Sequence, residues 1–301
     1  MEIQSSKGFR LIEKWLSKKG LSAFPFQEET WAKILNGYSG LVNAPTGCGK
    51  TFSVFLGALI QFINEHPNEL HKKNNGLQLL WITPLRALAK DLGRAMEAVL
   101  SETGIEWGVG IRNGDTSAEE RKQQKKQVPE VLIITPESLH LLLAQKNYSE
   151  TFKSLRIIAA DEWHELLGSK RGVQVELAIS RILGCRKKSE NQKLLQIWGI
   201  SATIGNLKQA KEVLLRPLHI LSERPLATIV TAQIAKKINI QSLIPEEIET
   251  YPWAGHLGLK MINDVIDVIM KSKTTLLFIN TRGMSERWYH ALVEHCPELA
   301  R

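Results

Sequence analysis

The chain has 301 residues, enough for two domains of roughly 150 residues or for one domain and part of another. Hydrophobic residues make up 43% and charged residues 23% of it, a globular balance that excludes wholesale disorder. Lys and Arg number 39 against 31 for Asp and Glu. The resulting net charge of +8 favours a polyanionic partner, although many proteins without one are equally basic.

The sequence carries no signal for a membrane or for secretion. Its most apolar run, residues 52–63, is broken by polar residues and is shorter than the roughly 18 residues of a membrane span. The first residues lack the basic and apolar regions of a secretory signal. Three widely spaced cysteines, Cys48, Cys185 and Cys296, argue against a disulfide framework or a structural zinc site. We therefore expect a cytoplasmic protein with no membrane partner.

Short apolar runs alternate with helical patterns over the first 215 residues. Continuous apolar runs are typical of parallel strands buried on both faces, and residues 85–100 repeat apolar positions at helical spacing. This alternation predicts an α/β fold with a doubly wound, mostly parallel sheet whose sites lie at the carboxyl ends of its strands. The expected strands are 41–43, 77–83, 107–111, 131–135, 155–160 and 194–200, and the expected helices include 51–63, 85–100 and 173–183.

The pattern changes after residue 215. Residues 216–255 contain several prolines and short β-like pieces at 227–230 and 238–240, which indicates a connecting region. A helix over 259–270 and a strand over 274–280 are expected next. Residues 256–301 are too few for a full second α/β domain and resemble the beginning of one. The expected domains are therefore 1–215, 216–255 and 256–301.

The strongest motif is A-P-T-G-C-G-K-T, between the first strand and a helix. A glycine-rich turn in this position brings backbone amides and a helix N-terminus to phosphate groups. Lys50 would neutralise the β and γ phosphates of a nucleotide, and the Thr51 hydroxyl would bind Mg²⁺. The motif predicts a loop for ATP and Mg²⁺, made of Ala44, Pro45, Thr46, Gly47, Cys48, Gly49, Lys50 and Thr51.

An acidic pair, Asp161 and Glu162, directly follows the strand at 155–160. Asp161 would hold the metal through water, and Glu162 would polarise the attacking water. The overlapping H-E-L-L-G begins like the zinc-protease motif H-E-x-x-H. Because Gly168 stands where that motif needs its second His, the zinc ligand pair is missing.

Three polar residues support the same nucleotide site. Ser201 and Thr203 follow the strand at 194–200, where their hydroxyls could sense the γ phosphate. Gln27 offers a donor and an acceptor together, as recognition of adenine requires. Taken singly, each also fits a turn or a helix start without function, so their value lies in their order along the chain.

Further segments fit contacts to a nucleic-acid backbone. Residues 83–89 and 135–139 each place a hydroxyl and a helix N-terminus after a strand, although an ordinary capped helix start explains them too. The basic run 121–126 is better explained as a solvated helix face. Most of the eight tryptophans fit the core, and Trp163 and Trp253 are the candidates for base stacking. The candidate strand-contacting residues are Thr83, Arg86, Gly114, Thr135 and Ser138.

The order of these blocks resembles superfamily 2 helicases, and within them the large helicase-related (Lhr) family. Residues 161–174, D-E-W-H-E-L-L-G-S-K-R-G-V-Q, and residues 251–258 are similar to bacterial ligase-associated DEXH-box helicases. The resemblance covers essentially the whole chain. It implies a RecA-like P-loop domain, a linker and the start of a second RecA-like domain.

The resemblance also implies an activity and residue roles. The family members are ATP-dependent DNA helicases or translocases that move 3′ to 5′ on single-stranded or partly duplex DNA, act in repair with a DNA ligase and a nuclease, and belong to the bacterial nucleoid. Gln27 would read adenine, and Lys50, Asp161, Glu162 and His164 would be catalytic. His164, Ser201 and Thr203 would couple hydrolysis to movement, and Thr281 and Arg282 match the first motif of the second motor domain.

One departure from the family pattern changes the expected activity. A complete motor needs a second RecA-like domain whose arginine fingers complete the site, and residues 256–301 contain only its beginning. We expect this chain to bind Mg-ATP, to hydrolyse it slowly and not to unwind duplexes. An RNA helicase on the same fold and a non-catalytic nucleic-acid-binding module remain the alternatives. The intact Lys50, Asp161 and Glu162 argue against the second of these.

Overall fold

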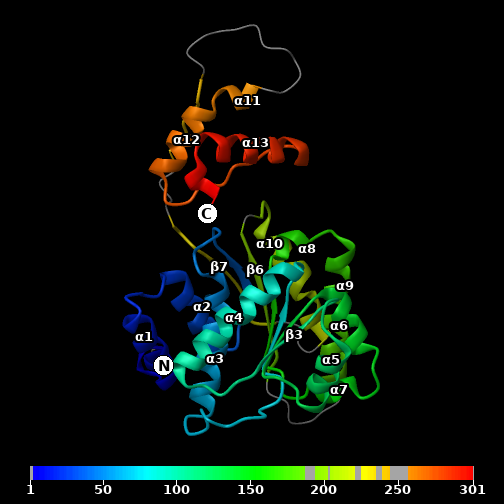
Figure 1. The fold of residues 1–301 in the computed structure, drawn as a ribbon. Helices are drawn as coiled ribbons and strands as arrows, with labels where there is room; N and C mark the ends of the chain where they lie inside the picture. Colours follow the sequence, from blue (N-terminus) through cyan, green and yellow to red (C-terminus); the bar gives the residue numbers. More distant parts are fainter. Residues whose placement is uncertain are drawn as a thin grey trace. The chain divides into compact units, whose positions relative to one another are not determined.

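The computed structural model describes residues 3–186, 194–202, 204–220, 225–234, 239–244 and 257–300. The chain divides into two compact units, Met1–Ala235 and Lys236–Arg301 (Figure 1). Thr203, Trp253 and most of the expected family segment at 251–258 lie outside the described residues. None of the described helices is both long and apolar enough to cross a lipid bilayer.

A seven-stranded sheet forms the centre of the first unit, and every neighbouring pair among its described strands is parallel. The strand order is β3-β4-β2-β5-β6-β1-β7, with Trp81 of β2 paired to Ala159 of β5 and to Ile133 of β4. This confirms the expected doubly wound α/β fold. The strands are β1 (Ser39–Asn43), β2 (Leu79–Ile82), β3 (Val109–Arg112), β4 (Val131–Ile134), β5 (Ile157–Ala160), β6 (Gln196–Ser201) and β7 (Ala227–Thr231).

Helices cover both faces of this sheet (Figure 1). Alternate strand residues point to opposite faces, so Trp81 belongs to one hydrophobic core while its neighbours Leu80 and Ile82 belong to the other. One core lies under α1 (Lys7–Lys18), α2 (Pro25–Leu35), α3 (Lys50–Glu65) and α4 (Arg86–Thr103). The other lies under α6 (Pro136–Leu143), α7 (Tyr148–Thr151), α8 (Trp163–Leu166), α9 (Lys170–Arg186) and α10 (Leu207–Leu215).

The helix α5 (Ala118–Lys126) packs loosely, and none of its side chains is buried. Its Gln124 Nε2 donates 2.9 Å to the carbonyl of Ile111 on the edge strand β3. The prediction that this basic helix is largely solvated is therefore correct. Its contact with the edge of the sheet is local.

The connecting region contains a strand of the main sheet. The strand β7 pairs with β1 from Ser39 and Ala227 to Asn43 and Thr231, so the first compact unit extends to Ala235, beyond the expected boundary at 215. A 3₁₀ helix, η2 (Arg216–Ile220), precedes it. The second β-like piece expected here, 238–240, is wrong in its described part, because residues 239 and 240 have no regular structure.

The second unit contains α11 (Leu257–Lys260), α12 (Ile262–Lys271), α13 (Arg282–His295) and the 3₁₀ helix η3 (Pro297–Ala300). The helix expected over 259–270 is confirmed. The strand expected over 274–280 is wrong, since this segment has no regular structure. A strand needs a hydrogen-bonded neighbour, and no described segment pairs with it. Leu276 and Phe278 are accordingly 77% and 88% exposed.

Candidate functional site

The predicted phosphate loop lies between β1 and α3, as the motif requires. Gly47 and Gly49 have φ values of +78° and +71°, in the left-handed region that favours glycine. Gly49 is also the N-cap of α3, and a Cβ added to it would lie 2.8 Å from Gln27 Nε2. The left-handed conformation therefore favours glycine at position 49, and a side chain there would also displace the Gln27 amide.

Lys50 begins α3 and is 8% exposed. Its Nζ is buried and has no hydrogen-bond partner among the described residues. A buried ammonium without partners is unfavourable, whereas phosphate oxygens at a helix N-terminus would supply both hydrogen bonds and opposite charge. The loop and its lysine therefore fit the phosphates of a nucleotide.

Gln27 lies against this loop. Its Nε2 donates 2.9 Å to the Gly49 carbonyl, and its Oε1 accepts a 2.9 Å hydrogen bond from Phe24 N at the start of α2. The side chain thus ties the helix start to the phosphate loop. One amide N–H and one oxygen lone pair remain for another partner.

Asp161 follows β5 at the same edge of the sheet and is 6% exposed. Its carboxylate accepts hydrogen bonds from Trp81 Nε1 at 3.2 Å and from Glu162 N at 2.9 Å. Burial and the adjacent Glu162 charge raise the pKa of Asp161 to about 6, against the opposing effects of Trp81, the Glu162 N–H and Lys50. Trp81 was not among the predicted site residues, because only the order of strands shows that β2 neighbours β5.

Glu162 adopts a left-handed backbone conformation, with φ of +45° and ψ of +47°. A non-glycine residue in this region is strained, and such strain gathers at functional sites. His164 Nδ1 lies 3.4 Å from Glu162 Oε2 and 3.0 Å from Ser201 Oγ. His164 therefore connects the acidic pair after β5 with the end of β6.

The loop also contacts β6 directly. Ala44 N donates 3.1 Å to the Ser201 carbonyl, and Ala44 is buried. Cys48 is a buried free thiol with its Sγ 3.8 Å from the Thr46 carbonyl, as expected for a small filler within the loop. The structure thus gathers the predicted loop, Asp161, Glu162, His164 and Ser201 at one edge of the sheet.

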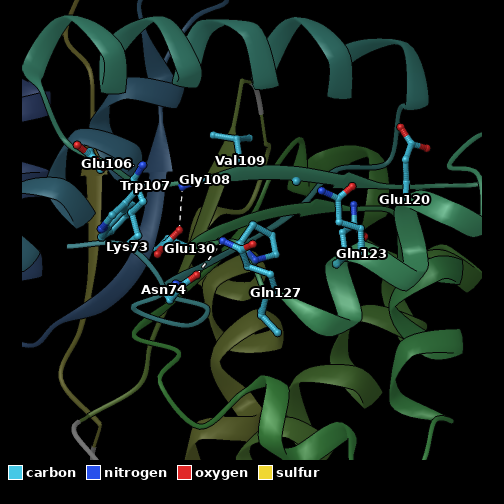
Figure 2. Close-up of a pocket in the computed structure, with 14 residues that line it drawn as sticks. Lys73, Asn74, Glu106, Trp107, Gly108, Val109, Glu120, Gln123, Gln127 and Glu130 are labelled. Carbon is cyan, nitrogen blue, oxygen red and sulfur yellow. Dashed lines mark hydrogen bonds and ion pairs between the residues drawn. The ribbon is translucent and has the colours of Figure 1, made fainter. Parts of the chain in front are cut away.

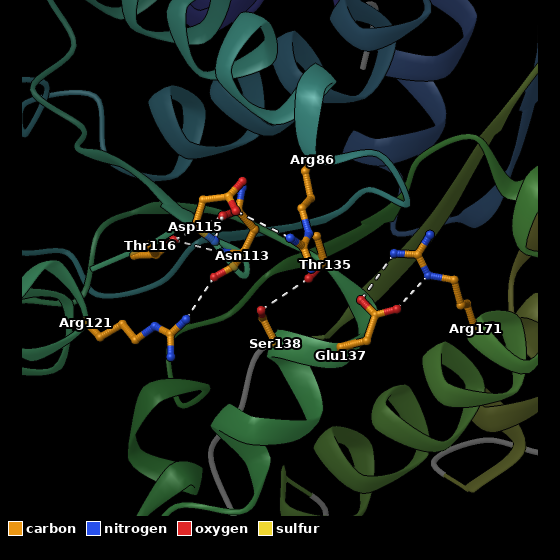
Figure 3. Close-up of polar contacts among 9 residues, drawn as sticks. All are labelled: Arg86, Asn113, Asp115, Thr116, Arg121, Thr135, Glu137, Ser138 and Arg171. Atoms are coloured by element: carbon orange, nitrogen blue, oxygen red, sulfur yellow. Dashed lines mark hydrogen bonds and ion pairs between the residues drawn. The ribbon is translucent and has the colours of Figure 1, made fainter. Parts of the chain in front are cut away.

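Figure 3 shows three of the predicted strand-contacting residues, Arg86, Thr135 and Ser138, with the polar contacts around them. Arg86 Nη1 lies 3.3 Å from Asp115 Oδ1, and a Cβ added to Gly114 would lie 2.7 Å from the Arg86 guanidinium. The turn after β3 and the start of α4 therefore form one surface. Thr135 Oγ1 donates 3.2 Å to Ser138 Oγ on the neighbouring α6.

Three of the predicted hydroxyls are less accessible than their role suggests. Thr83, Thr135 and Ser138 are all buried, and Thr83 Oγ1 has no hydrogen-bond partner among the described residues. Thr281 and Arg282 belong to the second unit, where Thr281 Oγ1 caps α13 by accepting from Met284 N at 3.3 Å.

One tryptophan differs from expectation, and one arginine makes a contact that was not predicted. Trp163 is fully buried, and its Nε1 donates 3.0 Å to the Ala210 carbonyl, so its proposed role in base stacking is wrong. Arg171 makes a two-pronged ion pair with Glu137, at 2.6 and 3.2 Å (Figure 3). Its position within the D-E-W-H segment was the only sequence signal for this contact.

A cavity of about 590 Å³ lies elsewhere (Figure 2). Gly108 and Glu130, which line it, precede β3 and β4, so the cavity opens at the amino ends of the strands. Glu130 Oε2 accepts a 2.8 Å hydrogen bond from Gly108 N, which fastens two connecting loops together. None of the predicted site residues lines this cavity.

The parallel sheet and its glycine-rich loop define a RecA-like nucleotide-binding protein of the P-loop class. The family described as DEAD/DEAH box helicase matches residues 24–212, and the chain belongs to that family. Membership in this family agrees with the nucleotide-binding motifs of the sequence.

Among its relatives is the ATP-dependent helicase Lhr-Core of Sulfolobus acidocaldarius, 30% identical over 283 residues, which are 92% of this chain and 31% of that protein. The Lhr helicase/uracil glycosylase of Escherichia coli is 29% identical over 308 residues, which cover 91% of this chain and 19% of that protein. The chain thus spans about a third or less of these relatives.

The Mycobacterium smegmatis helicase Lhr bound to ssDNA and AMP-PNP is similar in structure. It has a TM-score of 0.76 and 26% identity, covering 100% of this chain and 37% of that one. The expected resemblance to Lhr helicases, over their N-terminal portion, is therefore confirmed. The finer resemblance to ligase-associated helicases stays a prediction.

Proposed function

We propose that this chain carries the ATP-binding part of an ATP-dependent helicase or translocase acting on single-stranded DNA. The observation that carries this proposal is the buried, unpartnered Nζ of Lys50 at the N-terminus of α3. A polyphosphate is the ligand whose charge and geometry suit that position.

The residues around Lys50 would have separate roles in binding and hydrolysing the nucleotide. The loop amides and Lys50 would hold the β and γ phosphates, Gln27 would contact the base, and Thr51 and Asp161 would hold Mg²⁺. When bound, Mg²⁺ would neutralise phosphate charge and stabilise the leaving oxygen. Glu162 would orient the attacking water and accept its proton, and its pairing with His164 would keep the carboxylate in place.

A nucleic-acid strand is the partner that the remaining observations favour. The chain is basic, with a net charge of +8, and Arg86 and Gly114 form one surface. The similar Mycobacterium smegmatis helicase has ssDNA bound. Movement from 3′ to 5′, a role in bacterial DNA repair and partnership with a ligase and a nuclease rest on the family resemblance alone. Thr83, Thr135, Ser138, Thr281 and Arg282 remain proposed strand contacts, and Thr203 a proposed partner of Ser201.

The proposed domain organisation explains why this chain should be a weak motor. Hydrolysis in this class needs arginine fingers from a second RecA-like domain, of which residues 256–301 would supply only the beginning. We therefore propose that the chain binds Mg-ATP and single-stranded DNA, turns ATP over slowly and does not unwind duplexes.

ATP turnover with and without single-stranded DNA, together with binding of a fluorescent ATP analogue, tests this proposal. We expect Mg-dependent binding, slow turnover, and loss of that turnover in Glu162→Gln. Absence of Mg-ATP binding would instead favour a non-catalytic nucleic-acid-binding module. Tighter binding of RNA than of DNA of the same sequence would favour an RNA helicase, because only RNA offers the 2′-hydroxyl.

A further inference from the structure

A basic hollow adjoins the surface formed by Arg86 and Gly114. It encloses about 470 Å³ between the end of β3, the exposed helix α5 and the helix α6. Its described lining includes four cations and no carboxylate. The polar lining residues are Arg112, Arg121, Lys122, Lys125, Ser138 and Gln145.

Arg112 is the unusual member of this group. It is 6% exposed, yet its guanidinium makes no hydrogen bond or ion pair with any described residue. Burial, and then the nearby charge of Arg121, lower the pKa of Arg112. A largely buried cation beside a like charge would be stabilised by an anion that reaches both groups.

Arg121 has unused donors of its own. Its Nη2 donates 3.0 Å to the Asn113 carbonyl, whereas its buried Nε has no partner among the described residues (Figure 3). Two guanidinium groups therefore line one hollow with donors that the protein itself leaves unfilled. Guanidinium forks match phosphate oxygens in both shape and charge.

The hollow is continuous with the proposed strand path. Asn113, which anchors Arg121, directly precedes Gly114, against which Arg86 packs. Ser138 lines the hollow and is bonded to Thr135 at the start of α6. A strand that crosses Arg86 and Gly114 would therefore reach the hollow without leaving the surface.

We propose that this hollow, with Arg112 at its base and Lys122 and Lys125 at its rim, binds backbone phosphate of the nucleic-acid strand. The inference rests on the proposed function, since it extends the path of the same strand. It gives α5 a role in strand binding. Phosphate contacts of this kind fix the position of a strand without reading its sequence.

Fluorescence anisotropy of a labelled single-stranded oligodeoxynucleotide, measured with the 301-residue chain over a range of KCl concentrations, tests the inference. The Lys122→Ala/Lys125→Ala variant should bind about tenfold more weakly. The magnitude of its log–log salt slope should fall by about 1.4, since each phosphate contact to a single strand contributes about 0.7. Lys14→Ala/Lys18→Ala, which removes the same charge from exposed positions on α1, is the matched control and should bind like the parent protein.

Arg112→Gln separates binding from structure. If Arg112 binds a phosphate of the strand, this variant should bind the strand at least threefold more weakly than the parent protein. Without the strand, it should melt at a temperature no lower than that of the parent. If it melts lower and binds with an unchanged salt slope, Arg112 has a structural role and is not a phosphate ligand. The lysine pair tests the hollow independently of that result.

The outcomes distinguish this inference from the proposed function. If the parent protein binds no single-stranded nucleic acid, both fail. If it binds and the α5 variant binds equally well, or no worse than the α1 control, only the hollow is excluded. Titration with inorganic phosphate completes the test. Phosphate binding that depends on Arg112, alongside unchanged strand affinity, would assign the hollow to a free anion and overturn the proposal.

Discussion

Ser201 Oγ lies 3.0 Å from His164 Nδ1, which is also 3.4 Å from Glu162 Oε2. This contact joins the loop after β5 to the end of β6. A change in the position of Glu162 on nucleotide hydrolysis would therefore reach β6 through a single side chain.

Removing the Ser201 hydroxyl should leave nucleotide binding intact and abolish the stimulation of ATP turnover by single-stranded DNA. Ser201→Ala is a small change at a fully buried position and leaves Lys50 and the phosphate loop intact. We expect the affinity for a Mg-ATP analogue to stay within about twofold, since less than 0.5 kcal/mol is involved. Any stimulation of ATP turnover by single-stranded DNA should be lost. Stimulation equal to that of the parent protein would show that the His164–Ser201 contact carries no coupling.

Replacing Lys50 should have opposite effects on binding and on stability. Lys50→Met removes a buried ammonium that lacks partners, so the nucleotide-free protein should melt at the same or a higher temperature. Mg-ATP should then raise the melting temperature of the parent protein and not that of the variant. Lys14→Met, at an exposed position of α1, should behave like the parent in both respects. Equal stabilisation of Lys50→Met by Mg-ATP would place the nucleotide elsewhere.

The ionisation of Asp161 should make the nucleotide-free protein less stable as pH rises. Because its pKa is raised from 3.8 to about 6, the folded state holds a proton that the unfolded state has already released. Stability should fall between about pH 4 and pH 6, by roughly 3 kcal/mol when complete.

Asp161→Asn should abolish that loss. Without Mg²⁺ and nucleotide, its melting temperature should exceed that of the parent at pH 8 and converge with it near pH 4. Asp91→Asn, at an exposed position of α4, should show no such crossover. A parent protein that is equally stable at pH 5 and pH 8 would contradict this expectation.

Gly49 should tolerate no side chain. Gly49→Ala combines a left-handed φ with a Cβ 2.8 Å from Gln27 Nε2, so we expect a loss of about 1 kcal/mol or more and weaker ATP binding. Gly184→Ala is the matched control, because it lies within α9 and its Cβ would meet nothing within 4 Å. Helix propensity predicts a gain there of roughly 0.5–1 kcal/mol. Chemical denaturation of the two variants measures both effects, and equal losses would refute the conformational argument.

Local patterns accounted for most of the fold and for the nucleotide loop, but they failed where a neighbour decides the structure. Residues 274–280 have the apolar composition of a strand and yet form none, because no described segment pairs with them. Trp163 follows the site motif and could have been a stacking residue, but its indole is held in the core by Ala210. Arg112 belongs to no recognised motif, and only its burial and its lack of a partner among the described residues identify it as a candidate phosphate ligand.

Sequence patterns were sufficient to predict the phosphate loop, the acidic pair and the alternation of strands and helices. These features depend on local physics: glycines that permit a left-handed turn, apolar runs that must be buried, and polar residues where a strand ends. The hydrogen bond from Trp81 to Asp161 and the contact between His164 and Ser201 become visible only in the folded protein. Those contacts follow from the strand order, in which β2 and β6 flank β5. The order of strands across a parallel sheet differs from their order along the chain, so local sequence patterns do not predict which strands are neighbours.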